Sequence, residues 1–496
     1  MERFLLAIDQ STSGTKAIIF DEAGRLVRRH TVEHTQYYPH PGWVEHDATE
    51  IYQKTLRAVA AVLDESGMDR RRIAALAVTN QRETVLIWDK ITGKPVYNAV
   101  VWQCQRAGPL CKTLAEQGYG PVVRQKTGLI LAPYFSAPKL RWILDHVPGV
   151  RADAEARRLL LGTMDTWLIW NLTGGKVHAT DLSNASRTLL FNIQTLQWDP
   201  QLLEIFTIPA SMLPEVRASD ANFGFTSLAS LLPQEIPIAG VAGDSHAALF
   251  GQNCFEKGMA KATYGTGSSI MMNIGDRPLA SESGLVTAIA WGLNGRVDYV
   301  FEGNVNCTGD TLKWLVDGAQ LIASPGESGP IASTVNDNDG VYLVPAFVGL
   351  GAPYWDSEAR ASITGISRGT KKAHLVRAAL ESIAYQIKDI IDLMIAESGI
   401  QLRELRVDGG PAKNDLLMKF QADMLDVTVV RNKTEELSAL GAALIAGLTT
   451  GIWKDEAEIR ALRVQDAVFE SRMNASTRDE LYRGWKEAVR RSLSSF

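Results

Sequence analysis

The chain opens on three short apolar runs separated by polar turns. Residues 4–8, 15–20 and 25–32 have the length and composition of strands, and the short polar loop DQSTSG joins the first two. Residues 47–65 then repeat apolar positions at helical spacing, which predicts an amphipathic helix. Residues 74–78 and 84–88 again have the pattern of strands. Because strands precede the first helix, the order does not match a simple βαβ dinucleotide fold.

A related pattern returns in the second half. Strands are predicted at 236–242, 259–264, 268–274, 285–291, 297–301 and 405–407, and helices at 374–397 and 437–448. Glycines in GQNCFEKG interrupt the apolar pattern near residues 250–258. The 496 residues suffice for two domains of ordinary size. We expect an N-terminal domain at 1–250 and a C-terminal domain at 251–496, built as a duplicated α/β unit with a cleft between them.

Composition narrows the classes of partner. A hydrophobic content of 46% with 22% charged residues is typical of a soluble globular protein, and a net charge of −5 argues against a nucleic-acid partner. No apolar run reaches the roughly 18 residues that a membrane span needs, and the N-terminal run is too short for a signal peptide, so no membrane insertion is expected. The four cysteines show no metal-ligand spacing. We therefore expect a cytoplasmic protein with reduced thiols.

The loop after the first predicted strand is the first candidate for chemistry. Asp9 ends that strand, and Ser11 to Gly14 turn the chain back into the second strand. Such a hairpin can present backbone N–H groups and hydroxyls to phosphate oxygens, and a strand-end carboxylate can hold Mg²⁺. The same residues also suit an ordinary polar hairpin. The segment matches neither the P-loop pattern nor GxGxxG.

A second strand end carries another carboxylate. Gly243, Asp244, Ser245 and His246 follow the predicted strand at 236–242 and begin a run of small residues. Phosphoryl transfer from ATP needs a group that orients and deprotonates the attacking hydroxyl, and Asp244 is the candidate base. The alternative is that Asp244 only caps the following helix. His246 is either a ligand contact or a half-buried histidine.

Further polar clusters lie between predicted strands. TYGTGSS at 263–269 and DGGPAKN at 408–414 are glycine-rich turns that would let a base or phosphate approach the backbone, or are turns only. Arg82 and Glu83 could either form hydrogen bonds to vicinal hydroxyls of a ligand or form an ion pair at the surface. Trp102, Tyr134 and Phe135 suit either an apolar pocket wall or the core.

Taken together, these residues resemble the FGGY carbohydrate kinases, and within that family the glycerol kinases. The resemblance runs from about residue 4 to about residue 453 and includes GWVEHDATEIY and VPAFVGLGAPYWD. Two spaced family patterns are met, one by YFSAPKLRWILDH at 134–146 and one by segments at 361–366 and 374–381. The resemblance implies two ribonuclease-H-like, actin-like ATPase domains with ATP and the acceptor in the cleft between them.

The resemblance also implies roles for residues at matching positions. It implies Asp244 as the base, Asp9 and Asp244 as the Mg²⁺ ligands, and a homodimer or homotetramer as the assembly. The phosphates would lie near Thr12, Ser13, Gly14 and Lys16, and the rest of the nucleotide near Thr266, Gly309, Lys313, Gly410 and Asn414. The acceptor would contact Arg82, Glu83, Trp102, Tyr134, Asp244, Ser245 and Ser269.

Two positions depart from the glycerol kinase pattern. Those kinases usually have Gln where Ser245 stands and Phe where Ser269 stands, so the two serines predict a larger and more polar acceptor pocket. The sequence therefore predicts an ATP-dependent kinase of a small polyol, with glycerol as the first candidate. The alternative acceptor is a four- or five-carbon polyol or ketose such as erythritol, threitol, erythrulose, xylulose or ribulose.

Two rival functions share the expected fold. A non-catalytic sugar-binding protein would be expected to have lost Asp9 and Asp244, yet both are present. An actin-like assembly ATPase would not need the acceptor cluster that includes Arg82, Trp102 and Tyr134. A kinase remains the function that the residues favour.

Overall fold

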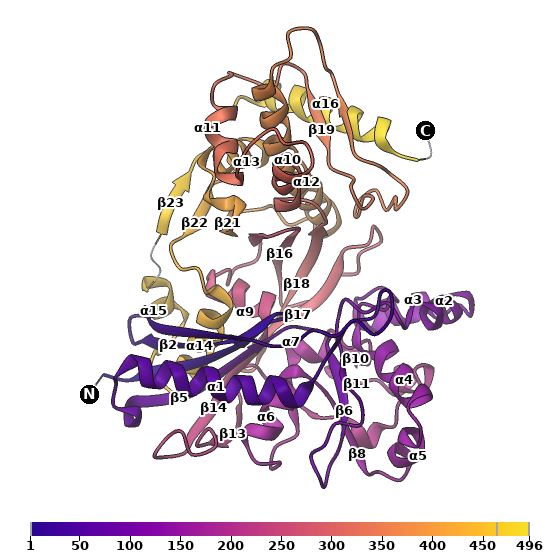
Figure 1. Ribbon diagram of the computed structural model, residues 1–496, viewed down its shortest axis with the longest axis vertical. Helices are drawn as coiled ribbons and strands as arrows, with labels where there is room; N and C mark the ends of the chain where they lie inside the picture. The colour runs from indigo at the N-terminus through magenta and orange to yellow at the C-terminus, as the bar shows by residue number, and fades with distance from the viewer. Residues whose placement is uncertain (1, 463–464, 495–496) are drawn as a thin grey trace.

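The computed structural model describes residues 2–462 and 465–494 and shows two lobes (Figure 1). The lower lobe in Figure 1 is built on a six-stranded sheet of order β13-β14-β5-β1-β2-β3. Its strands are β1 (Phe4–Gln10), β2 (Gly14–Asp21), β3 (Leu26–Glu33), β5 (Ile73–Asn80), β13 (Asn222–Thr226) and β14 (Ile236–Gly243). The first three form an antiparallel meander, and β5 and β14 run parallel to β1. The predicted opening meander is confirmed.

The second sheet repeats this plan. Its order is β17-β18-β16-β15-β21-β22-β23, with β15, β16 and β18 antiparallel in turn and β21 and β22 parallel to β15. The strands are β15 (Met259–Tyr264), β16 (Ser268–Gly275), β17 (Val286–Leu293), β18 (Arg296–Val305), β21 (Glu404–Gly409), β22 (Val429–Asn432) and β23 (Gln465–Phe469). Three antiparallel strands followed by two parallel strands in both sheets confirm the predicted duplication.

The three helices that the periodicity predicts are present, at 48–66, 372–398 and 437–449, together with further helices that it did not predict. α1 (Ala48–Ser66) begins at Asp47, whose carboxylate accepts from two backbone N–H groups of the first turn. The long α12 (Lys372–Ser398) and α13 (Asp415–Leu425) contribute to the core of the upper lobe with α10 (Gly309–Asp317) and α16 (Ala475–Ser492). No helix in the described ranges is both long and apolar enough to span a bilayer.

One expected strand belongs to a different sheet. The strand predicted at 84–88 is β6 (Val85–Asp89), which lies with β4 (Glu45–His46), β7 (Ala99–Val100) and β8 (Leu159–Thr163) in a separate four-stranded sheet. β5 and β6 are joined by the turn at 81–84, so the chain leaves the large sheet there. That turn carries Arg82 and Glu83 to the cleft side of the lobe.

α14 (Leu437–Thr449) packs against elements that are distant from it in the sequence. It packs on β14, β5 and β1 and against α9 (Asp244–Gly251), all elements of the first half of the chain. Gly240 and Gly441 permit this contact, because a Cβ on either would meet backbone atoms at 2.4 Å and 1.7 Å respectively. The small residues predicted for this helix are therefore explained by close packing.

Candidate active site

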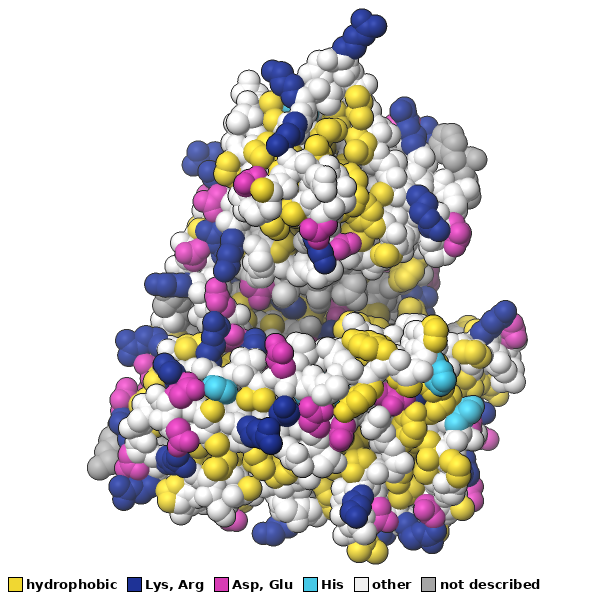
Figure 2. All heavy atoms as spheres, viewed as in Figure 1, with side chains coloured by type: hydrophobic (Ala, Val, Ile, Leu, Met, Phe, Trp, Pro, Cys, Tyr) yellow, Lys and Arg dark blue, Asp and Glu magenta, His cyan; other side chains and the backbone are white. Residues whose placement is uncertain are grey.

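The carboxyl ends of parallel strands bring the predicted acceptor residues together. Asp9 lies near the end of β1 and Asp244 directly after β14, and β5 pairs with both strands between them. A cavity of about 650 Å³ opens at this edge, between the two lobes, where Figure 2 shows the surface hollowed. All the expected acceptor residues line it, namely Arg82, Glu83, Trp102, Tyr134, Asp244, Ser245 and Ser269, together with Thr12.

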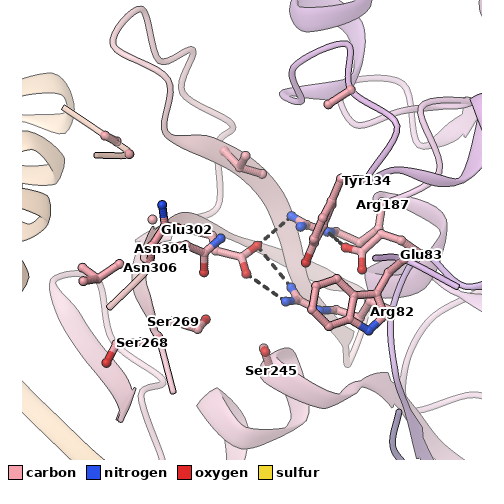
Figure 3. Close-up of a pocket in the computed structure, with 18 of the residues that line it drawn as sticks. Arg82, Glu83, Tyr134, Arg187, Ser245, Ser268, Ser269, Glu302, Asn304 and Asn306 are labelled. Carbon is pink, nitrogen blue, oxygen red and sulfur yellow. Dashed lines mark hydrogen bonds and ion pairs between the residues drawn. The ribbon is translucent and has the colours of Figure 1, made fainter. Parts of the chain in front are cut away.

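A buried cluster of opposite charges forms one side of this cavity (Figure 3). Arg82 donates from both terminal nitrogens to Glu302 at 3.1 and 2.8 Å, and Arg187 forms ion pairs with Glu302 at 2.7 Å and Glu83 at 2.6 Å. Burial opposes the ionisation of Glu302, but Arg187 and Arg82 outweigh it and hold the pKa of this carboxyl well below its usual range. These four charged side chains hold one another in place inside the protein. The interpretation of Arg82 and Glu83 as a surface ion pair is therefore wrong.

Asp244 is connected to this cluster through one oxygen. Its Oδ1 lies 3.1 Å from Nε of Arg82 and accepts from the N–H of Ser245 at 2.6 Å. The side chain retains 36% exposure in the cavity, so the carboxylate is accessible to an acceptor. Asp244 is the first residue of α9 and Gly243 is the N-cap. The alternative in which Asp244 serves only as a helix cap is therefore wrong.

Gly243 and His246 shape the space behind Asp244. A Cβ on Gly243 would lie 2.7 Å from Cγ of Arg82, so the glycine makes room for that side chain. His246 is buried, and burial together with Arg82 and Arg187 lowers the pKa of its imidazole. Neither ring nitrogen has a hydrogen-bond partner within the described ranges, and His246 does not line the cavity. His246 is therefore neither a contact of a ligand in this cavity nor half-buried, because its side chain is fully enclosed.

The residues of the hairpin after β1 differ in whether they face the acceptor cavity. Thr12 lines the cavity and accepts a hydrogen bond from Nε1 of Trp102 at 2.9 Å. Ser13 is exposed at the turn. Position 14 has no room for a larger residue, because a Cβ on Gly14 would lie 2.9 Å from the carbonyl oxygen of Val32 in the neighbouring strand. Lys16 donates to Glu436 at 2.7 Å and lies 3.9 Å from Asp9, so its ammonium is already neutralised.

Asp9 fits a divalent cation. Burial raises the pKa of its carboxyl to about 7, with Lys16 opposing this and the negative charges of Asp244 and Glu436 adding to it. A cation between Asp9 and Asp244 would offset these repulsions. No cluster of three or more His, Cys, Asp or Glu side chains suited to a metal occurs in the described part of the chain. Two carboxylates suit Mg²⁺, which prefers few protein ligands alongside phosphates and water.

A second cavity of about 820 Å³ lies on the C-terminal side. Four of the expected nucleotide residues line it: Thr266, Gly309, Gly410 and Asn414. Gly265 lines both cavities, so the two cavities adjoin at this residue. The expected Lys313 is exposed on α10 and does not line this cavity.

Several lining residues escaped the sequence analysis. On the nucleotide side these come from the turn before α11 (Ser328–Ala332) and from α11 itself, including Gly326, Ser328 and Gly329. On the acceptor side they are Arg187, Glu302, Asn304, Asn306 and Trp355. Arg187 lies within the segment SNASRTLLFNI, which matches the family. This match could have identified Arg187 from the sequence.

Comparisons with known proteins identify the family of the chain. Residues 4–251 match the N-terminal domain of the FGGY family of carbohydrate kinases and residues 260–450 match its C-terminal domain. The chain is 53% identical over 489 residues to a glycerol kinase of Bacillus thuringiensis and 52% identical over 491 residues to glycerol kinase 2 of Thermotoga maritima, each covering 99% of both chains.

The crystal structure of Plasmodium falciparum glycerol kinase with ADP superposes with a TM-score of 0.95 at 38% identity, covering 99% of this chain and 98% of that one. A gluconate kinase of Lactobacillus acidophilus, at 22% identity and a TM-score of 0.90, shares the fold. These findings confirm the predicted two-domain, actin-like α/β architecture. The chain belongs to the FGGY family of carbohydrate kinases.

Proposed function

We propose that the protein transfers the γ-phosphoryl group of ATP to a hydroxyl of a small polyol, with glycerol as the acceptor that the names of its relatives indicate. One observation carries the proposal. The cavity lined by Asp244 and Arg82 adjoins the cavity lined by Gly410 and Asn414, since Gly265 lines both. An acceptor in the first and a nucleotide in the second would meet at the phosphate.

Asp244 would act as the base. Within the described ranges both of its polar contacts, to Arg82 and to the N–H of Ser245, use Oδ1. Oδ2 therefore accepts the proton of the attacking hydroxyl. The acceptor oxygen forms a bond to the γ-phosphorus, the bond from that phosphorus to the β–γ bridging oxygen breaks, and ADP leaves. Arg82 orients both the base and the acceptor.

Asp9 and Asp244 would hold the Mg²⁺ that accompanies ATP. When bound, the ion neutralises charge on the phosphate oxygens. Thr12, Ser13 and Gly14 would face those phosphates from the hairpin. Lys16 acts indirectly in this arrangement, because its pairing with Glu436 keeps it in place beside Asp9.

The wider setting is also a proposal. A division near residues 250–258 is supported by the end of α9 at Gly251 and the start of β15 at Met259. We propose a cytoplasmic protein without nucleic-acid partners, in keeping with the charge and composition of the chain, and a homodimer or homotetramer, as the family resemblance implies. The rival functions, a non-catalytic sugar-binding protein and an actin-like assembly ATPase, lack support from the acceptor cavity.

Replacement of the proposed base tests the function. Wild-type protein should release ADP from ATP only when glycerol or another polyol is added. Asp244→Asn, which is nearly isosteric, should lower kcat by about 100-fold or more while the melting temperature changes little. The exposed Asp479 on α16 gives a matched control, Asp479→Asn. Near-wild-type turnover in Asp244→Asn would remove Asp244 from this role, and ADP release without any acceptor would favour the assembly ATPase.

A further inference from the structure

The wall of the acceptor cavity opposite Tyr134 carries neutral polar side chains beyond Glu302, whose charge Arg82 and Arg187 neutralise. Side chains alternate along β18, so Glu302 and Asn304 share one face, and Asn306 continues this spacing just beyond the strand. Ser269 on β16 pairs with Asn304 in the ladder. Figure 3 shows Ser269, Asn304 and Asn306 grouped on the side of the cavity away from Tyr134.

These three side chains have unused hydrogen-bonding capacity. Asn304 and Asn306 are exposed in the cavity, and their amides form no hydrogen bond to another residue of the described ranges. The hydroxyl of Ser269 is a buried oxygen that likewise lacks a partner there. Since a buried polar atom without a partner costs free energy, a ligand group that bonds Ser269 would be favoured. Amides and hydroxyls both donate and accept, as sugar hydroxyls do.

The charges nearby exclude an ionic ligand at this wall. Arg82 and Arg187 are neutralised by Glu302 and Glu83, so neither guanidinium is free for a carboxylate or phosphate. The remaining lining of this side is apolar or neutral and includes Val286 and Trp355. The wall therefore suits hydroxyl or carbonyl oxygens of a neutral molecule.

The cavity is also large for a three-carbon acceptor. A water molecule takes about 30 Å³ of liquid volume, so a molecule of six heavy atoms such as glycerol fills on the order of 150 Å³. The cavity holds about 650 Å³, part of which the transferred phosphoryl group would occupy near Thr12 and Gly265. Space remains along β16 and β18 for further carbons.

Resting on the proposed kinase function, we propose that Ser269, Asn304 and Asn306 form an additional acceptor subsite that selects a neutral four- or five-carbon polyol or ketose over glycerol. The reactive hydroxyl lies at Asp244, and the hydroxyls on the far carbons bond the two amides and the serine. Asn304 and Asn306 are thus specificity-determining residues of the same reaction.

The experiment measures ADP release by the full chain with glycerol, erythritol, threitol, erythrulose, xylulose and ribulose. At least one four- or five-carbon acceptor should have a higher kcat/KM than glycerol. Asn304→Ala and Asn306→Ala should each lower the ratio of that kcat/KM to the glycerol value by roughly 3–10-fold, the effect of one lost hydrogen bond. The best acceptor should also raise the melting temperature of the wild type more than that of either variant.

A matched control is Asn336→Ala, since Asn336 is exposed on the loop after α11 and lies outside the cavity. This variant should keep the wild-type ratio. Glycerol as the best acceptor, with ratios unchanged in Asn304→Ala and Asn306→Ala, would overturn the subsite and leave the kinase intact. Absence of ADP release with every acceptor would instead refute the proposed kinase function and, with it, the subsite.

Discussion

Removal of the charge on Glu302 should destabilise the protein and weaken acceptor binding together. Its carboxylate is 1% exposed and holds two guanidiniums, Arg82 through two hydrogen bonds and Arg187 at 2.7 Å. In Glu302→Gln the amide preserves the shape, but both cations lose a buried counter-charge. Removing one partner of a buried ion pair costs about 3–5 kcal/mol, so the free energy of unfolding should fall by that amount.

The same substitution should raise KM for the acceptor, because Arg82 would no longer be held beside Asp244. Urea unfolding and ADP-release kinetics measure the two effects. Glu487→Gln on α16 is the matched control, since the side chain of Glu487 is 41% exposed and pairs with two arginines at the surface; the loss of stability in this variant should be clearly smaller. Glu302→Gln with wild-type stability would show that the cluster does not depend on this charge, and the reasoning would fail.

Three further changes give sharp outcomes. Ser269→Phe fills the acceptor cavity and should shift the kcat/KM ratio toward glycerol by about tenfold; an unchanged ratio would contradict the pocket argument. Gly243→Ala places a Cβ 2.7 Å from Cγ of Arg82 and should lower kcat/KM for the acceptor, whereas Gly108→Ala, with open space around it, should not. Burial lowers the pKa of His178 from its usual 6.5 to about 4, so the unfolded state binds more protons between these values. Stability should therefore fall as the pH drops from 6.5 toward 4, and urea midpoints at pH 7 and 5 should converge in His178→Gln; an identical pH slope would refute this.

Local pattern was sufficient for most of the architecture. Apolar runs of strand length and helical spacing located the meander of β1 to β3, strands β15 to β18 and β21 of the second sheet, and α1, α12 and α14; β22 and β23 were not predicted. The pattern could not tell that β6 leaves the large sheet, because sheet membership depends on pairing with distant strands such as β8. It also ended the strand at 297–301 too early, since a charged Glu302 inside a strand is tolerated only because distant arginines neutralise it.

The site was predictable where chemistry and family pattern coincide. Asp244, Arg82 and Tyr134 lie in one cavity as expected. Lys313 does not line the nucleotide cavity, because its side chain lies on the solvent face of α10, whereas the adjacent Leu312 lines that cavity. Asn304 and Asn306 escaped because a single asparagine in a strand carries no signal of its own. Their place in the cavity depends on their spacing from Glu302 along β18 and just beyond it, and this wall of the cavity forms only when the sheet folds.

The placement of α14 has a mechanical consequence. The chain enters the upper lobe after Gly251, returns to the lower lobe after Asn432 to form α14 and α15 (Glu456–Ala461), and crosses again to reach β23. Three covalent crossings restrain sliding of one lobe along the other more than they restrain rotation, so the expected motion is a hinge that opens and shuts the cleft. For the same reason, a single proteolytic cut in any one crossing would leave the two lobes tethered, and the two fragments would separate on a gel only in denaturant.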